Sequence, residues 1–306
     1  MSNPSPFKRV LITGATGYIG SNLVSHLVKQ GLDVHIITRP NSDLKVLDSI
    51  LSAITLHRHD GTSAGMVEVL ANAKPEIVFH LASLFLAQHK TGDIESLISS
   101  NLLFSTQLVE AMAVNGVNYL VNTGTSWQRY NNEDYNPVNL YAATKQAFED
   151  ILTYYIKAHG LKATTLALFD TYGPNDPRAK LIALLWKTAN SQQPLSMSPG
   201  EQLIDIVYID DVIRAYIKMA DLLLVQIDGY SCYGVSSGKP MRLKELVAAF
   251  QKATKTKLPI SFGSRPYRPR ETMVPWTEFK SIPGWYPQVP LEQGIMLSRP
   301  ASTSEF

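Results

Sequence analysis

Short apolar runs alternate with longer segments of helical period up to about residue 172. The runs have the length and composition of buried strands, and the segments between them repeat apolar residues every three or four positions. Such alternation predicts a parallel sheet covered by helices on both faces. The expected strands are 9–13, 34–38, 54–57, 77–81, 119–123 and 163–169, and the expected helices are 18–30, 63–73, 94–115 and 140–159.

Composition excludes several classes of protein. The 306 residues include 28 Lys+Arg and 26 Asp+Glu, and the net charge of +2 is too small for a nucleic-acid-binding surface. Cys232 is the only cysteine, so an internal disulfide and a cysteine-rich zinc site are excluded. No run approaches about 18 apolar residues, and the polar start lacks the features of a signal peptide. We therefore expect a cytoplasmic protein with no metal and no membrane contact.

A glycine-rich turn directly follows the first expected strand. Gly14, Gly17 and Gly20 form a Gly-x-x-Gly-x-x-Gly pattern between this strand and the first helix. Glycines allow a sharp turn, let a pyrophosphate approach the backbone and let the helix pack close to the strand. An ordinary tight turn is the alternative, but this context favours a dinucleotide site. The residues expected to bind it are Gly14, Thr16, Gly17, Tyr18, Ile19 and Gly20.

The end of the second strand favours NADP(H) over NAD(H). An NAD-selective site often has an acid there that binds the ribose 2′-hydroxyl. This chain has no acid before Asp43, and Arg39 stands where a 2′-phosphate would lie. A solvated loop charge is the alternative for Arg39. Asp60, after the third strand, is a candidate for the adenine amino group or else a turn or helix-cap residue before Gly61.

The α/β pattern weakens after Tyr172, where the expected helices 181–190, 212–224 and 243–252 mix with short strands and loops rich in proline and glycine. We therefore expect an α/β fold with a doubly wound parallel Rossmann sheet and a smaller, discontinuous α+β lobe. The expected domains are 1–173 for NAD(P) binding, with returning segments from the later chain, and 174–298 mainly for substrate. Residues 299–306 are expected to form a flexible tail.

Tyr141 and Lys145 form the candidate catalytic pair. Their spacing of four places both side chains on one helix face. An ammonium group near a phenol favours the phenolate, so the pair could donate or accept a proton beside a carbonyl. A surface pair is the alternative. The preceding strand, however, ends in Thr123-Gly124-Thr125-Ser126, which places hydroxyls at the sheet edge where such folds bind ligands.

Motifs along almost the whole chain point to one family. They are the glycine loop, His80-Leu81-Ala82-Ser83, Thr125, Tyr141-x-x-x-Lys145, Tyr172-Gly173-Pro174, and the segments 205–212, 267–271, 284–287 and 291–295. Together they resemble the extended short-chain dehydrogenase/reductases, the NAD-dependent epimerase/dehydratase family, whose members modify nucleotide-activated sugars. The resemblance implies an enzyme that acts on a nucleotide-diphosphate sugar.

The resemblance also implies roles for individual residues. Tyr141 would be the general acid/base, and Lys145 would lower its pKa and hold the nicotinamide ribose. Thr125 would hydrogen-bond the reacting oxygen, with Ser126 as the alternative. Asn101 matches a family asparagine near the active site or is a helix cap. Further cofactor contacts would come from Leu81, Ala82 and Ser83, and substrate contacts from Ser126, Asp170 and Arg268.

Departures from the family pattern narrow the expected reaction. No Asp-Glu pair follows Thr125, so elimination chemistry is not expected. Asp170 stands where many relatives have an asparagine at the substrate diphosphate, and an acid facing a diphosphate would be repulsive. Ile204 replaces a frequent arginine. The usual diphosphate contacts are therefore not all present.

The predicted function is NADPH-dependent reduction of the 4-keto group of a CDP-linked 4-keto-6-deoxy or 3,6-dideoxy hexose, in deoxysugar and O-antigen precursor biosynthesis. The active-site segments look most like the 4-reductases that complete CDP-linked paratose and abequose. An NAD-dependent nucleotide-sugar 4-epimerase is the alternative, disfavoured by the missing acid after strand two. A non-catalytic NADP-binding regulator is more distant, because it would not need an intact Tyr141 and Lys145.

A homodimer through a four-helix bundle is also expected. The helices 94–115 and 140–159 carry apolar residues on more than one side, and relatives often pair these helices. Packing against the sheet is the alternative for part of this apolar surface. The residues concerned are Leu102, Leu103, Leu108 and Met112 in the first helix and Phe148, Leu152, Tyr155 and Ile156 in the second.

Overall fold

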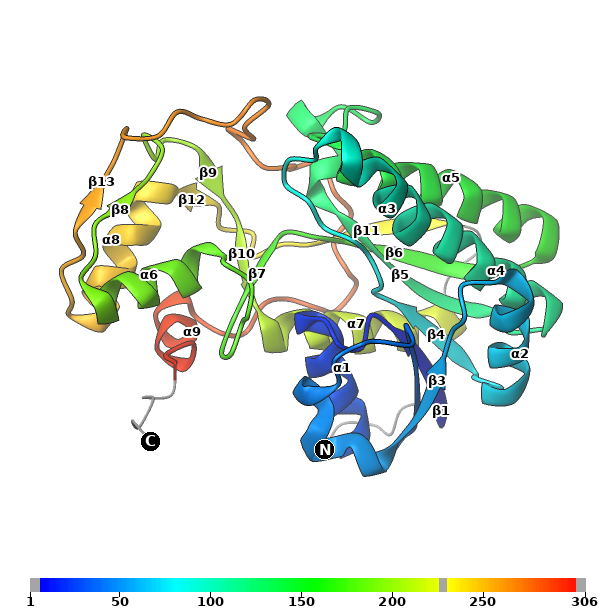
Figure 1. Cartoon of the computed structure of the whole chain (residues 1–306). Helices are drawn as coiled ribbons and strands as arrows, with labels where there is room; N and C mark the ends of the chain where they lie inside the picture. Colours follow the sequence, from blue (N-terminus) through cyan, green and yellow to red (C-terminus); the bar gives the residue numbers. More distant parts are fainter. Residues whose placement is uncertain (1–5, 226–229, 301–306) are drawn as a thin grey trace.

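The computed structural model describes residues 6–225 and 230–300. Figure 1 shows a large α/β domain beside a smaller lobe. Seven parallel strands form the large sheet in the order β11-β6-β5-β4-β1-β2-β3. The fold class expected from the sequence is confirmed. The strands are β1 (Arg9–Thr13), β2 (Asp33–Thr38), β3 (Ile54–Arg58), β4 (Ile77–His80), β5 (Tyr119–Thr125), β6 (Lys162–Leu168) and β11 (Ser231–Val235).

Helices cover both faces of this sheet, and each face has its own apolar core. Side chains alternate along a strand, so Val10 and Ile12 of β1 pack on one face and Leu11 on the other. The first face is covered by α1 (Tyr18–Lys29) and α7 (Ile209–Val225), and the second by α2 (Ser63–Ala73), α4 (Phe104–Val114) and α5 (Leu140–His159). A 3₁₀ segment over Lys45–Ala53, not expected from the sequence, follows β2.

The expected helix 94–115 is interrupted by a π-helical turn. It consists of α3 (Ile94–Ile98), the π segment η3 (Ser99–Leu103) and α4. Residues Thr91–Val114 are long and apolar enough, by length and composition, to cross a membrane, which corrects the expectation that no stretch would qualify. In the structure this stretch packs beside α2 and α5 and contributes to the core, as a buried helix of a folded domain does.

The smaller lobe is discontinuous in sequence. Its helices are α6 (Leu181–Ser191), α8 (Leu243–Thr254) and α9 (Leu291–Leu297), and its short strands are β8 (Leu195–Ser196), β9 (Leu203–Ile204), β12 (Met241–Arg242) and β13 (Ile260–Ser261). The parallel pair β7 (Asp170–Tyr172) and β10 (Ile206–Tyr208) lies at the junction with the large domain (Figure 1). Between these lobe segments, α7 and β11 return to the large sheet. Residues 301–306 of the expected tail lie outside the described residues.

Candidate active site

The candidate site is a cavity of about 230 Å³ at the carboxyl edge of the large sheet. The connections leave β1 and β4 in opposite directions there, and open α/β sheets bind ligands at such a switch point. Most of the expected site residues meet in this cavity: Gly14, Gly17, Tyr18, Ile19, Gly20, Leu81, Ser83, Thr125, Ser126, Tyr141, Lys145 and Asp170 line it. Thr16, Arg39, Asp60, Ala82 and Arg268 are not among its lining residues.

The glycine loop forms a backbone cradle that has no room for a side chain at Gly14 or Gly20. Gly14 has a φ of +72°, and a Cβ at this position would lie 2.6 Å from the backbone nitrogen of Ala82. A Cβ on Gly20 would collide with the carbonyl oxygen of Gly14. Helix α1 begins after Gly17 without a side-chain cap, so its first N–H groups face the cavity free to bind an anion. These features fit a dinucleotide pyrophosphate.

A buried chain of hydrogen bonds fixes the loop after β4 against this cradle. The Thr13 hydroxyl accepts from the Leu81 and Ala82 amides at 3.2 and 3.1 Å and must therefore donate to His80 Nδ1, 2.7 Å away. His80 Nε2–H then donates to the Ser105 hydroxyl at 2.8 Å. Burial lowers the pKa of His80 to about 3, so the imidazole is neutral and holds this single tautomer.

Asn101 continues this network from the π turn to α5, the helix that carries Tyr141 and Lys145. Its Oδ1 accepts from the Leu84 amide at 2.7 Å and from the Ser83 hydroxyl at 3.2 Å. Its Nδ2 donates to the Leu84 carbonyl and to the Thr144 hydroxyl, both at 3.0 Å. Asn101 is 2% exposed and lies inside the helix, so the interpretation of this residue as a helix cap is wrong. The extra residue of a π turn redirects a side chain that a regular helix would place elsewhere.

Tyr141 and Lys145 lie buried side by side on α5, which is capped by Asn139 through a 2.9 Å bond from the Ala142 amide. Burial raises the pKa of Tyr141 to about 12, opposed by a hydrogen bond with Ser83. Burial lowers the pKa of Lys145 to about 8, opposed by the charge of Glu149. The groups that lower the pKa of Tyr141 are Ser83 and Arg178, and the expected lowering by Lys145 is not found. Tyr141 is therefore held protonated, in the form that donates a proton.

Two hydroxyls at the end of β5 face the cavity near this pair. Thr125 caps the short 3₁₀ helix η4 (Ser126–Gln128), its hydroxyl oxygen accepting from the Trp127 amide at 3.3 Å. The Ser126 hydroxyl has no hydrogen-bond partner in the described part of the chain. Both residues line the cavity, so either hydroxyl can serve a bound oxygen.

A buried carboxylate behind the catalytic residues was missed by sequence reasoning. Gln128 accepts from the Thr125 amide at 2.9 Å and donates to Glu149 Oε1 at 2.9 Å. Glu149 is 2% exposed, and burial raises its pKa. It lies one turn after Lys145 on α5, and this i+4 spacing is the sequence signal that could have indicated it.

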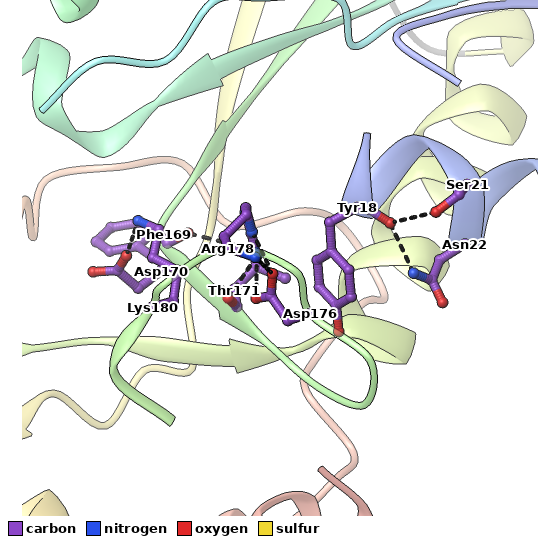
Figure 2. Close-up of polar contacts among 9 residues, drawn as sticks. All are labelled: Tyr18, Ser21, Asn22, Phe169, Asp170, Thr171, Asp176, Arg178 and Lys180. Atoms are coloured by element: carbon purple, nitrogen blue, oxygen red, sulfur yellow. Dashed lines mark hydrogen bonds and ion pairs between the residues drawn. The ribbon is translucent and has the colours of Figure 1, made fainter. Parts of the chain in front are cut away.

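Two basic residues on the far wall were also missed. Figure 2 shows Lys180 beside Asp170, with Nζ 2.9 Å from Oδ1. Arg178 is paired twice with Asp176 at 2.8 Å and lies with its guanidinium 4.7 Å from the ring centre of Tyr18. Both basic residues and Asp170 line the cavity. The negative charge expected to repel a diphosphate at Asp170 is therefore balanced by the Lys180 ammonium.

The expected site residues outside this cavity have other surroundings. Arg39 is exposed, and its side chain has no hydrogen-bond or ion-pair partner among the described residues. Asp60 accepts from the Thr62 amide at 2.8 Å, which is the turn role considered as its alternative. Arg268 pairs with Glu271 at 2.8 Å and lines an adjacent cavity that shares Trp127 with the first. The described residues contain no group of three or more His, Cys, Asp or Glu side chains placed to hold a metal.

Comparison with known proteins identifies the family. The model of the NAD dependent epimerase/dehydratase family matches residues 10–224. The chain belongs to this family. The CDP-abequose synthase of Yersinia pseudotuberculosis is 27% identical over 90% of this chain and 94% of its own length. The UDP-glucose 4-epimerase of Mycolicibacterium smegmatis is 28% identical over 97% of this chain and 98% of its own length.

A solved structure of the family agrees with the fold described above. The UDP-glucose 4-epimerase of Thermus thermophilus, in complex with NAD, superposes with a TM-score of 0.80 at 25% identity, and the match covers 95% of this chain and 97% of that one. The family resemblance expected from the motifs is therefore confirmed, including the likeness to enzymes of CDP-deoxysugar synthesis. Relatives of similar identity catalyse two different reactions, so family membership does not decide between them.

Proposed function

We propose that this protein uses NADPH to reduce the 4-keto group of a CDP-linked 4-keto-6-deoxy or 3,6-dideoxy hexose, as a cytoplasmic step in making deoxysugar precursors of O-antigen. The observation that carries the proposal is that Tyr141 and Lys145 line the same cavity as the glycine cradle. A reduced ketone needs a proton at its oxygen, and a phenol held in its acid form supplies one. The similarity to CDP-abequose synthases supports the choice of substrate.

The chain's own residues account for the remaining roles. When bound, NADPH would supply the hydride. The backbone of the Gly14–Gly20 loop would hold its pyrophosphate, and Lys145 would hold the nicotinamide ribose. Thr125 or Ser126 would donate a hydrogen bond to the sugar O4 and orient the carbonyl toward Tyr141. Tyr141 would then give its proton to O4 as negative charge develops there.

The proposed preference for NADP(H) depends on Arg39. Its exposed, unpaired guanidinium at the end of β2 is available to a 2′-phosphate, and a charge-assisted contact of this kind is strong for a single side chain. Lys180 and Arg268 are the proposed contacts for the sugar-nucleotide diphosphate. They border the two adjoining cavities and take the place of the arginine that Ile204 replaces.

The deciding experiment follows NADPH absorbance when the protein is given CDP-4-keto-6-deoxyglucose or its 3-deoxy derivative. We expect stoichiometric oxidation of NADPH and a product with a hydroxyl at C4. No oxidation with either CDP-sugar, nor with the dTDP- and GDP-linked 4-keto-6-deoxy sugars, contradicts the reductase.

A nucleotide-sugar 4-epimerase is the second candidate, favoured by the 28% identity to the epimerase of Mycolicibacterium smegmatis. An epimerase oxidises and re-reduces C4 and therefore needs no net NADPH. Incubation with UDP-glucose and analysis for UDP-galactose separates the two candidates. Formation of UDP-galactose without consumption of NADPH would replace the reductase by the epimerase.

We also propose a homodimer through α3, α4 and α5, in which Leu103 is the one expected residue that is exposed. Leu108, Met112, Phe148 and Leu152 are fully buried and pack on the sheet. The exposed apolar residues on these helices are Ile94, Ile98, Leu103, Val114 and Tyr154. Light scattering at micromolar concentration should give a dimer mass, and Leu103→Glu should shift it to a monomer. A monomer for the wild type contradicts the proposal.

A further inference from the structure

An aromatic wall formed by Phe85 and Trp127 closes the cavity beside the candidate catalytic tyrosine. The Phe85 ring lies edge-on to Tyr141 with centroids 5.0 Å apart, and tilted to Trp127 at 5.7 Å. All three residues line the cavity. Phe85 is 42% exposed, although water is a poor neighbour for a phenyl ring. The wall therefore presents apolar surface directly beside the group that would protonate the substrate.

Two cations border this wall. Lys180 Nζ lies 4.8 Å from the ring centre of Phe85, and the Arg268 guanidinium lies 5.4 Å from that of Trp127. The surface is thus apolar at its centre and bordered by two ion pairs, Lys180 with Asp170 and Arg268 with Glu271, whose cations lie nearest the rings. A ligand that matches it has an apolar portion next to an anionic portion, and a nucleotide-diphosphate sugar gains such apolar surface where its sugar lacks hydroxyls.

The chemistry of the sugar indicates which of its carbons form the apolar portion that contacts the two rings. If Tyr141 faces the oxygen on C4, the carbons within two bonds of C4 lie against Phe85 and Trp127. A 6-deoxy sugar carries its methyl group there, and a 3,6-dideoxy sugar adds a methylene carbon on the other side of C4. An ordinary hexose would bring hydroxyls to the same rings, and these would lose hydrogen bonds to water without replacement.

We propose that Phe85 and Trp127 are specificity-determining residues that select a hexose deoxygenated beside C4, by packing its apolar edge against the two rings. The inference rests on the proposed function only in taking Tyr141 as the residue that faces C4. Neither residue was expected to be part of the site from the sequence: no motif covers Phe85, and Trp127 was noted only as a position that lacks the carboxylate of the Asp-Glu pair.

Calorimetric titration tests the proposal with two sugars that do not react. CDP-6-deoxyglucose and CDP-glucose, which already carry a hydroxyl at C4, are titrated into the full chain saturated with NADPH, so that no hydride transfer can occur in either direction. The wild type should bind the 6-deoxy sugar about 10- to 100-fold more tightly, the usual discrimination by an apolar pocket. Phe85→Ser and Trp127→Ser should bring the affinity ratio close to one, whereas Phe85→Leu should keep much of it.

Phe262→Ser is the matched control. Phe262 is also 42% exposed but lines neither cavity, so this variant should keep the wild-type ratio. Equal affinity for the two sugars in the wild type, or no binding of either, overturns the proposal. An equal loss for both sugars in Phe85→Ser also overturns it, because the rings would then be a general stacking surface. NADPH oxidation is measured separately, so a preference without turnover contradicts only the reductase.

Discussion

The proposed cofactor half and the proposed substrate half of the cavity differ in what forms them. The cofactor half consists of backbone: glycines with no room for a side chain, open N–H groups of α1, and a loop held by the Thr13–His80–Ser105 chain. The proposed substrate half consists of side chains from several distant segments, among them Phe85, Asp170 and Lys180, with Arg268 in the adjacent cavity. Backbone geometry preserves one binding mode, whereas side chains can be exchanged to change specificity.

The largest effect is expected from Gly20→Ala, which disrupts the backbone half. The new Cβ would collide with the Gly14 carbonyl oxygen, a backbone atom that cannot move without opening the loop. We expect no saturable binding of NADPH in a fluorescence titration, with circular dichroism of a folded protein. Gly92→Ala is the matched control, since a Cβ there meets nothing within 4 Å. NADPH affinity close to wild type in Gly20→Ala would contradict the assignment of the cradle.

Tyr141→Phe should have the next largest effect on activity. Tyr141 lies between the glycine loop and Phe85, where the two halves of the cavity meet. The change removes one oxygen and keeps the ring against Phe85. We expect the turnover number to fall by about 10²- to 10⁴-fold, the usual contribution of a general acid. NADPH affinity should remain unchanged, because the cradle is intact. Turnover within a few-fold of wild type would instead assign the proton to Thr125, Ser126 or water.

Lys180→Met tests whether the side chains of the substrate half bind the diphosphate. The variant leaves the Asp170 carboxylate without its ion-pair partner, facing the proposed diphosphate. We expect KM for the nucleotide sugar to rise about 10- to 100-fold, the loss of one charge-assisted contact, with little change in kcat. The double variant Lys180→Met/Asp170→Asn should recover part of this loss. If KM is unchanged in the single variant, Lys180 does not contact the diphosphate.

Arg39→Ala should produce the smallest change, because Arg39 is exposed to solvent. We expect the affinity for NADPH to fall by about tenfold, which is the lower limit of the usual contribution of a hydrogen bond to a charged group. The affinity for NADH serves as the internal control and should not change. Equal affinities for both cofactors in the wild type would show that Arg39 does not read the 2′-phosphate.

Local patterns were enough to predict six of the seven strands of the large sheet, whereas β11, which returns from the later chain, was not located. Each expected strand is present with ends displaced by at most two residues, because apolar runs and glycine turns are properties of neighbouring residues. The residues of the glycine loop that line the cavity, with Tyr141 and Lys145, were predicted for the same reason. The short strands of the smaller lobe were not located, because their pairing depends on partners far away in the chain.

The remaining site features depend on contacts that no local motif encodes. Lys180 approaches Asp170 across a turn, and Arg268 reaches Trp127 from the far end of the chain. The π turn that directs Asn101 inward is a one-residue departure from helical period, too small to see in an apolar pattern. The raised pKa of Tyr141 follows from burial, which the spacing to Lys145 does not report.

Strand β11 belongs to the large sheet but is translated well after the other six strands. The outer edge of β6 pairs with β11 over Thr164 to Leu168, and α7 covers one face of the same region. A ribosome releases residues 1–173 long before either element, so the nascent sheet carries an open edge and an uncovered apolar face, which are the surfaces that aggregate. Synthesis therefore delays completion of the first domain until about half of the second has been translated, and a fragment cut at residue 173 should be insoluble.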